Sequence, residues 1–194
     1  IAKYPDTANA PFLMMLLRDY SPDVVHSSIV SASALKNKEF CPFLVNYLES
    51  GEHFSSTYSA LVEIGENAID TLNNTFHRSI ISKKELKRLI HIVAEISGKK
   101  AVKYLIQKTT YQDRYVVIEV LKALKSLRYK VSGVHLYEFK QLLKRNIGIA
   151  AWNLNIQENL VTQNHSYEFT QSIKHEIHEN YEVIFLILSL MYDP

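Results

Sequence analysis

The sequence has only one cysteine, Cys41, among its 194 residues. One cysteine excludes a disulfide bond within the chain, which fits a reducing compartment. Cys41 lies between the aromatic residues Phe40 and Phe43. No basic residue stands directly beside it to lower the pKa of its thiol. We therefore expect Cys41 to be an inert thiol in the core.

Glycine and proline are also scarce, with five of each, which favours long helices joined by short turns. No signal peptide is visible at the start of the sequence. The most apolar run, Val183 to Met191, is shorter than the roughly 20 residues that a membrane-spanning helix needs. We expect a soluble segment with one sizeable core, and its ends at Ile1 and Pro194 suggest a piece of a longer protein.

Apolar residues recur at helical spacing along most of the chain, as in the series Val25, Ile29, Ala32 and Leu35. Local signals mark where helices begin. Ser82 followed by Glu85 predicts a capping box, and Asp113 predicts the N-cap of a later helix. After residue 132 the pattern predicts two long helices, 134–163 and 167–192, joined by a turn at 164–166.

Two stretches of the sequence resemble each other. Ala60–Leu72 reads ALVEIGENAIDTL and Ala94–Leu105 reads AEISGKKAVKYL. Their matched positions lie 33 residues apart: Gly65 with Gly98, Ala68 with Ala101, Ile69 with Val102, and Leu72 with Leu105. Each stretch predicts a helix, a glycine turn and a second helix. One such pair cannot bury its apolar face alone, so we expect the pairs between about residues 22 and 128 to stack.

These two stretches resemble HEAT repeats, a family of α-solenoids. The resemblance implies an all-α fold, namely a right-handed α-α superhelix over residues 1–132, ended by a long antiparallel helical hairpin over 133–194 that packs as a cap. HEAT proteins are mostly scaffolds and binding platforms without shared catalytic residues. The resemblance therefore implies a non-catalytic binding module that needs no cofactor.

The C-terminal stretch YEVIFLILSLMYDP resembles the helical-repeat regions of bacterial proteins that join HEAT-like repeats to a transporter of the ADP/ATP-translocase or major-facilitator type. This resemblance implies a cytoplasmic domain at the inner face of the membrane. It also implies a covalently linked transmembrane domain outside the present sequence.

Charge is distributed unevenly along the chain. Residues 83–145 hold 16 Lys and Arg against 5 Asp and Glu, a net charge of +11, whereas the whole chain has only +2. We predict an anion-binding surface formed by Lys99, Lys100, Lys103, Lys122, Lys125 and Arg128. Its partner would be a protein, an anionic membrane surface or, less favoured, nucleic acid. The alternative is that these side chains are only the solvated faces of amphipathic helices, paired with the acidic ends of the chain.

Catalytic and metal-binding patterns are weak. His175 and His178 are three residues apart, whereas the helical zinc-protease pattern needs two histidines four apart with a glutamate between them. Asp113, Arg114 and Tyr115 form the one aromatic-plus-aspartate cluster that a base-excising DNA repair enzyme would use, but Asp113 also suits an N-cap. We predict no enzyme activity and no metal site, with a nucleic-acid-binding repeat protein, including a base-excising enzyme, as the alternative.

Overall fold

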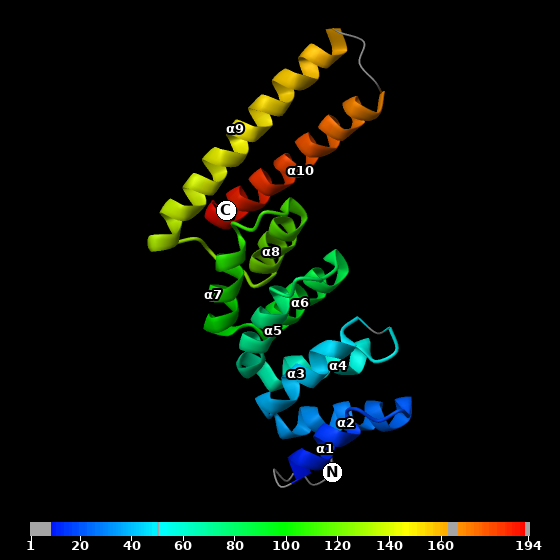
Figure 1. Ribbon diagram of the computed structural model, residues 1–194. Helices are drawn as coiled ribbons and strands as arrows, with labels where there is room; N and C mark the ends of the chain where they lie inside the picture. Colours follow the sequence, from blue (N-terminus) through cyan, green and yellow to red (C-terminus); the bar gives the residue numbers. More distant parts are fainter. Residues whose placement is uncertain (1–8, 50, 163–166, 193–194) are drawn as a thin grey trace. The chain divides into compact units, whose positions relative to one another are not determined.

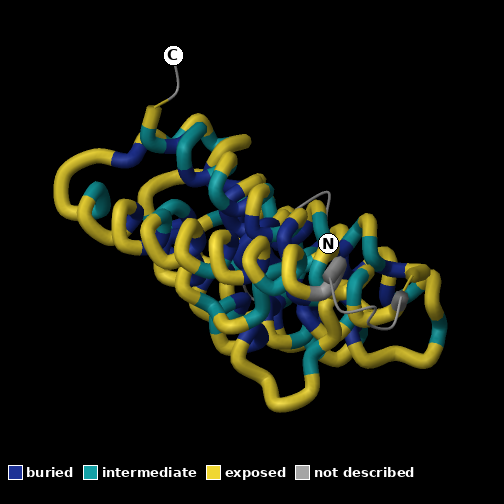
Figure 2. Tube along the Cα trace, turned by 90° about the horizontal axis from the view of Figure 1, so that it is seen from above, coloured by how far each residue is buried: buried dark blue, intermediate teal, exposed yellow. Residues whose placement is uncertain are grey.

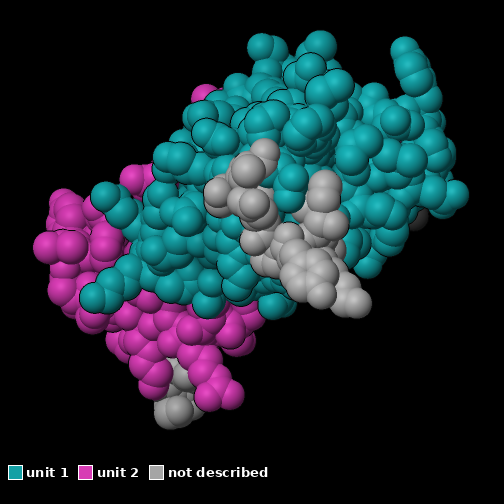
Figure 3. All heavy atoms as spheres, turned by 90° about the horizontal axis from the view of Figure 1, so that it is seen from below, with its two compact units in different colours: residues 1–104 teal, residues 105–194 magenta. Residues whose placement is uncertain are grey.

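The computed structural model describes residues 9–49, 51–162 and 167–192, and all regular secondary structure in these ranges is helical (Figure 1). The predicted all-α class is therefore confirmed. The chain divides into two compact units, residues 1–104 and 105–194, which Figure 3 shows in different colours. The division falls inside helix α7 (Gly98–Lys108), whereas the sequence suggested a boundary at residue 132. The helix before residue 132 belongs to the second unit because it packs on the last helix of the chain.

The first unit consists of short and medium helices. They are α1 (Ala10–Leu16), α2 (Pro22–Leu35), η2 (Lys38–Phe40), α3 (Cys41–Leu44), η3 (Val45–Tyr47), α4 (Phe54–Ile64), η4 (Gly65–Ala68), α5 (Ile69–Phe76), α6 (Lys83–Ile96) and the start of α7. The stretch from Lys38 to Tyr47 forms three short helical segments rather than one continuous helix. Pro42 stands at the start of α3, where its missing N–H is tolerated, but it could not continue a helix from the preceding turn.

The helices of the first unit pack in sequence. Helix α1 contacts α2, α2 contacts α4, and α4 contacts α6, while α5 also contacts α6. Phe40 and Phe76 are among the largest fully buried side chains, and Cys41, next to Phe40 in the sequence, is also buried, as expected. Figure 2 shows buried positions alternating with exposed ones along the helices, as expected for helices with one apolar face.

The local signals for helix starts are confirmed. The Ser82 hydroxyl accepts a hydrogen bond from the Glu85 N–H, and the Glu85 carboxylate accepts one from the Ser82 N–H, which completes the capping box of α6. The Asp113 carboxylate accepts the Tyr115 N–H at the start of α8 (Arg114–Ser126). The predicted N-cap role of Asp113 is therefore confirmed.

The second unit is built around two long helices, α9 (Val134–Thr162) and α10 (Tyr167–Met191), which pack against each other. Helix α10 also packs on α8. The Val131 N–H donates to the Leu190 carbonyl, 3.0 Å away, so the chain just before α9 lies at the end of α10. The two helices therefore run in opposite directions (Figure 1). The predicted turn at 164–166 lies outside the described residues.

Among the residues that the structure describes, no helix is both long enough and apolar enough to cross a bilayer. The buried positions of α9 and α10 are mostly apolar, but three are asparagines: Asn146, Asn153 and Asn180.

Candidate functional site

Three of the six predicted anion-binding residues lie in the first turns of α7, within the first unit. Lys100 is already engaged, because its N–H donates to Glu66 Oε1 at 3.1 Å and its Nζ lies 2.8 Å from Asp70 Oδ2. Lys99 and Lys103 are exposed and form no ion pair with any described residue. Two free ammonium groups, one turn apart, thus remain at the start of this helix.

The other three residues lie on or just after α8, in the second unit. The Nζ of Lys122 lies 2.7 Å from Glu182 Oε1 and 3.7 Å from Glu119 Oε1. The hydrogen bond to Glu182 raises the pKa of Lys122 above its usual value, despite an opposing contribution from burial. Lys125 and Arg128 are exposed, and neither forms an ion pair within the described part of the chain. Arg128 has a φ of 52°, which places it in the left-handed region directly after the helix.

Acidic residues of α10 neutralise much of the basic character of α8. The Arg114 guanidinium binds the Glu176 carboxylate, and its Nη1 also lies 3.9 Å from Glu179 Oε2. Together with the pair between Lys122 and Glu182, these contacts tie two cations of α8 to three carboxylates of α10. Four predicted cations stay free: Lys99, Lys103, Lys125 and Arg128. They are divided between the two units.

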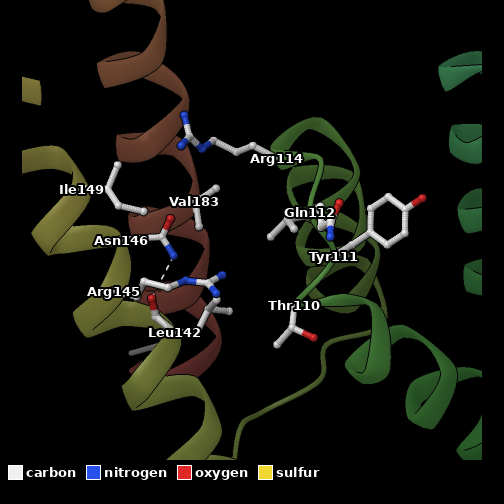
Figure 4. A pocket seen from close by; sticks show the side chains of 10 residues that line it. Thr110, Tyr111, Gln112, Arg114, Leu142, Arg145, Asn146, Ile149 and Val183 are labelled. Carbon is white, nitrogen blue, oxygen red and sulfur yellow. Dashed lines mark hydrogen bonds between the residues drawn. The ribbon is translucent and has the colours of Figure 1, made fainter.

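A pocket of about 350 Å³ lies within the second unit, between the chain before α8 and the long helices (Figure 4). Its lining comprises Thr110, Tyr111, Gln112, Arg114, Val117, Leu142, Arg145, Asn146, Ile149 and Val183. Val117, Leu142 and Val183 are buried and give the pocket apolar walls. Its volume falls in the range of small-molecule sites, which usually combine apolar walls with a few polar groups.

The polar groups of this pocket come from two sides. Arg145 reaches from α9 toward the segment of Thr110 and Gln112, whereas the Tyr111 ring points away from α9 and α10 (Figure 4). Asn146 is buried, and its Nδ2 donates to the Leu142 carbonyl at 2.8 Å, which fixes the orientation of its carboxamide.

The histidines noted in the sequence, His175 and His178, are exposed residues of α10. His175 lies on the exposed side of α10, and its Nε2 is 3.4 Å from Glu179 Oε1. In the part of the chain that the structure describes, no group of three or more His, Cys, Asp or Glu side chains is placed to hold a metal ion.

Apart from Arg114, which belongs to the cluster of Asp113, Arg114 and Tyr115, the residues that line the pocket follow no pattern in the sequence. Arg145 was counted only as one charge in the basic region, and Thr110 and Gln112 lie in a connection without a recognisable motif. A signal did exist in α9, because Asn146 and Asn153 place polar residues among the apolar buried positions of this helix. A buried polar residue indicates an unusual position in a helix, but it does not reveal that a pocket lies beside that position.

Comparison with known proteins identifies no family. No family model matches the sequence, and no curated protein matches it significantly. A similar solved structure is the crystal structure of an engineered protein, a target of the Northeast Structural Genomics Consortium. It is 17% identical and the match covers 99% of this chain and 87% of that one, with a TM-score of 0.38. A likeness of this size carries no argument about function.

Proposed function

We propose that the chain is a HEAT-like, non-catalytic binding platform. The observation that carries this proposal is the conformation of the two glycine turns noted in the sequence. Gly65 directly follows α4 with a φ of 72°, whereas Ser97 directly follows α6 with a φ of 56° and Gly98 comes next with a φ of 84°. Both helices therefore end in a residue of positive φ, and in both turns a glycine, which enters this region without a steric penalty, lies at or beside that position.

The two turns also contact each other, as expected for neighbouring repeats. Glu66, directly after Gly65, accepts the N–H of Lys100 in the first turn of α7. A Cβ on Gly98 would stand only 2.4 Å from Glu66 Oε1. The carboxylate also suits the positive end of the helix dipole of α7. The sequential packing of α2, α4 and α6 further supports a stack of helix pairs.

We propose an anionic membrane surface as the partner of the free cations. All four side chains are exposed, and three of the four are lysines that lie in helices: Lys99, Lys103 and Lys125. Lysine is a compact point charge without the planar fork that arginine uses for bidentate readout. Diffuse attraction to anionic headgroups, worth about 1 kcal/mol per cation near the surface, requires no such fork.

Co-sedimentation with vesicles tests the partner. We expect the chain to bind vesicles that contain phosphatidylserine and to ignore vesicles of phosphatidylcholine alone. The double variants Lys99→Gln/Lys103→Gln and Lys125→Gln/Arg128→Gln should each bind more weakly. The matched control is Lys36→Gln/Lys38→Gln, which removes the same charge outside the basic region and should bind like the unaltered chain.

Equal binding by all three double variants would contradict the role of the free cations. Retention on duplex DNA at about 50 mM salt, falling by about 0.9 log unit per released counterion per log unit of salt, would instead favour the nucleic-acid alternative. Attachment to a transporter is a separate part of the proposal. It predicts several apolar spans of roughly 20 residues encoded beside this segment, and their absence from the coding DNA would remove it.

A further inference from the structure

We propose that the pocket between the chain before α8, α9 and α10 binds a small organic anion, with a carboxylate or phosphate group next to an apolar body. The site is distinct from the proposed platform surface, since none of the four free cations lines it. Its existence does not depend on the HEAT-like function.

The charge of the residues that line the pocket favours an anionic ligand. Two arginines line it, and no acidic residue is among its lining residues, all of which lie in the described part of the chain. Arg114 is neutralised by Glu176 and by Glu179 at 3.9 Å. Arg145 is exposed and has no ion-pair partner within the described ranges. The pocket therefore contains one uncompensated guanidinium, whose planar fork matches a carboxylate or a phosphate.

The opposite side of the pocket supplies neutral polar groups. Arg145 extends across the pocket toward Thr110 and Gln112, as Figure 4 shows. Both of these residues are exposed, so their hydroxyl and amide groups are accessible. An anion held by Arg145 would thus lie within a region that offers further hydrogen-bond donors.

The apolar walls of the pocket indicate that the ligand also has an apolar group. Val117 and Val183 are buried apolar residues of α8 and α10, and Ile149 of α9 is half-buried. Inorganic phosphate would leave this surface uncovered. A ligand with an apolar group beside its acidic group would cover it, and a volume of about 350 Å³ accommodates such a molecule.

Arg114 has a positioning role in this arrangement. Its guanidinium also approaches the Glu176 carbonyl, with Nη1 3.4 Å from that oxygen, so one side chain ties the first turn of α8 to α10 at two points. Fixing these two elements holds Val117 and Val183 as walls of the same pocket.

The test uses the full chain, amide-resolved NMR and four probes: phenyl phosphate, benzoate, inorganic phosphate and benzyl alcohol. We expect saturable shifts at Thr110, Gln112 and Ile149 with phenyl phosphate or benzoate, at the millimolar affinity usual for fragments. Inorganic phosphate and benzyl alcohol should each bind more weakly, because each lacks one half of the ligand. The stronger of the first two probes identifies the acidic group.

The variant Arg145→Ala should weaken binding of the preferred probe by about tenfold or more, as loss of a charge-assisted hydrogen bond predicts. The control is Lys144→Ala, which removes an equal charge from the neighbouring exposed position of α9 and should change the affinity by less than about twofold. Equal affinity of Arg145→Ala and the unaltered chain would overturn the proposal. So would benzyl alcohol binding as tightly as the anions, or an absence of saturable shifts at about 20 mM of either acid.

Discussion

Gly98 and Gly148 illustrate how differently a missing side chain acts at two positions. Gly98 has a φ of 84° and faces the Glu66 carboxylate at a distance that leaves no room for a Cβ. Gly148 lies in the middle of α9, is exposed, and has no atom within 4 Å of the place where a Cβ would stand. The first glycine is required by backbone conformation and close approach, whereas the second only adds conformational entropy to the unfolded chain.

We expect Gly148→Ala to raise the free energy of unfolding by about 1 kcal/mol, the difference in helix propensity between the two residues. Gly98→Ala should lower it by at least about 1 kcal/mol, because alanine pays the cost of the left-handed region and meets Glu66. Urea denaturation of both variants measures the two changes. Loss of stability in Gly148→Ala would show that α9 is not a regular helix at that position.

At the scale of elements, the pairing of α9 with α10 includes an unusual buried group. Asn180 is fully buried, and neither polar atom of its side chain has a hydrogen-bond partner among the described residues. A buried amide without a partner costs about 1–3 kcal/mol. Asn146, on the facing helix, differs because its Nδ2 donates to the Leu142 carbonyl.

We expect Asn180→Leu, which keeps the branching at Cγ, to raise the free energy of unfolding by about 1–2 kcal/mol by removing the unsatisfied amide. Asn146→Leu is the matched control and should give no gain, because it also removes an existing hydrogen bond. Thermal and urea unfolding compare the two variants. A loss of stability in Asn180→Leu would mean that the amide is satisfied in solution, for example by a buried water.

The contact between α8 and α10 makes stability depend on pH through Lys122. The Glu182 carboxylate raises the pKa of this lysine in the folded chain, so its charged form is favoured by folding. The contribution is fully present below the pKa of the unfolded chain, near 10.5, and is lost as the pH rises through the higher pKa of the folded chain. Neutral conditions should therefore show the full effect.

We expect Lys122→Gln to be less stable than the unaltered chain at pH 8, with the difference shrinking above about pH 10.5. The difference between the two chains isolates Lys122 from tyrosines that titrate in the same range. Urea midpoints at several pH values provide the measurement. The control Lys125→Gln removes an exposed lysine of the same helix that has no ion-pair partner in the described chain, and it should show neither effect.

At the scale of the whole molecule, we expect attraction to an anionic surface to depend more on the distribution of charge than on the net charge. Residues 83–145 carry +11 in a chain whose total is +2, and part of this excess is neutralised by pairs such as Lys100 with Asp70 and Lys122 with Glu182. We propose that the remaining free cations dominate the attraction of the chain to an anionic surface, because they are exposed and unpaired among the described residues.

We expect the chain to be retained on a sulfonate cation exchanger at pH 7.5 despite its small net charge. The variant Lys125→Gln/Arg128→Gln should elute at lower salt than Lys36→Gln/Lys38→Gln, although both lose two positive charges. Elution of both variants at the same salt concentration would show that net charge, rather than the clustered cations, determines retention.

The sequence by itself determined the helical class, the helix starts at Ser82 and Asp113, and the two glycine turns. These features depend on residues a few positions apart, such as Ser82 with Glu85, or on one residue's conformational range, as at Gly65 and Gly98. The buried state of Cys41 followed from its apolar neighbours in the same way. Local chemistry was sufficient for each of these predictions.

Only the tertiary structure decided which charges are free and where a pocket forms. Arg114 meets Glu176 across 62 residues of sequence, and Lys100 meets Asp70 across 30. Such pairs depend on which helices pack together and on how each helix is rotated about its axis. The sequence pattern of a single helix gives neither of these. The same holds for Arg145, whose place in the pocket follows from the position of α9 relative to the chain before α8. Charge counted along the sequence becomes a binding surface only where packing leaves it unpaired.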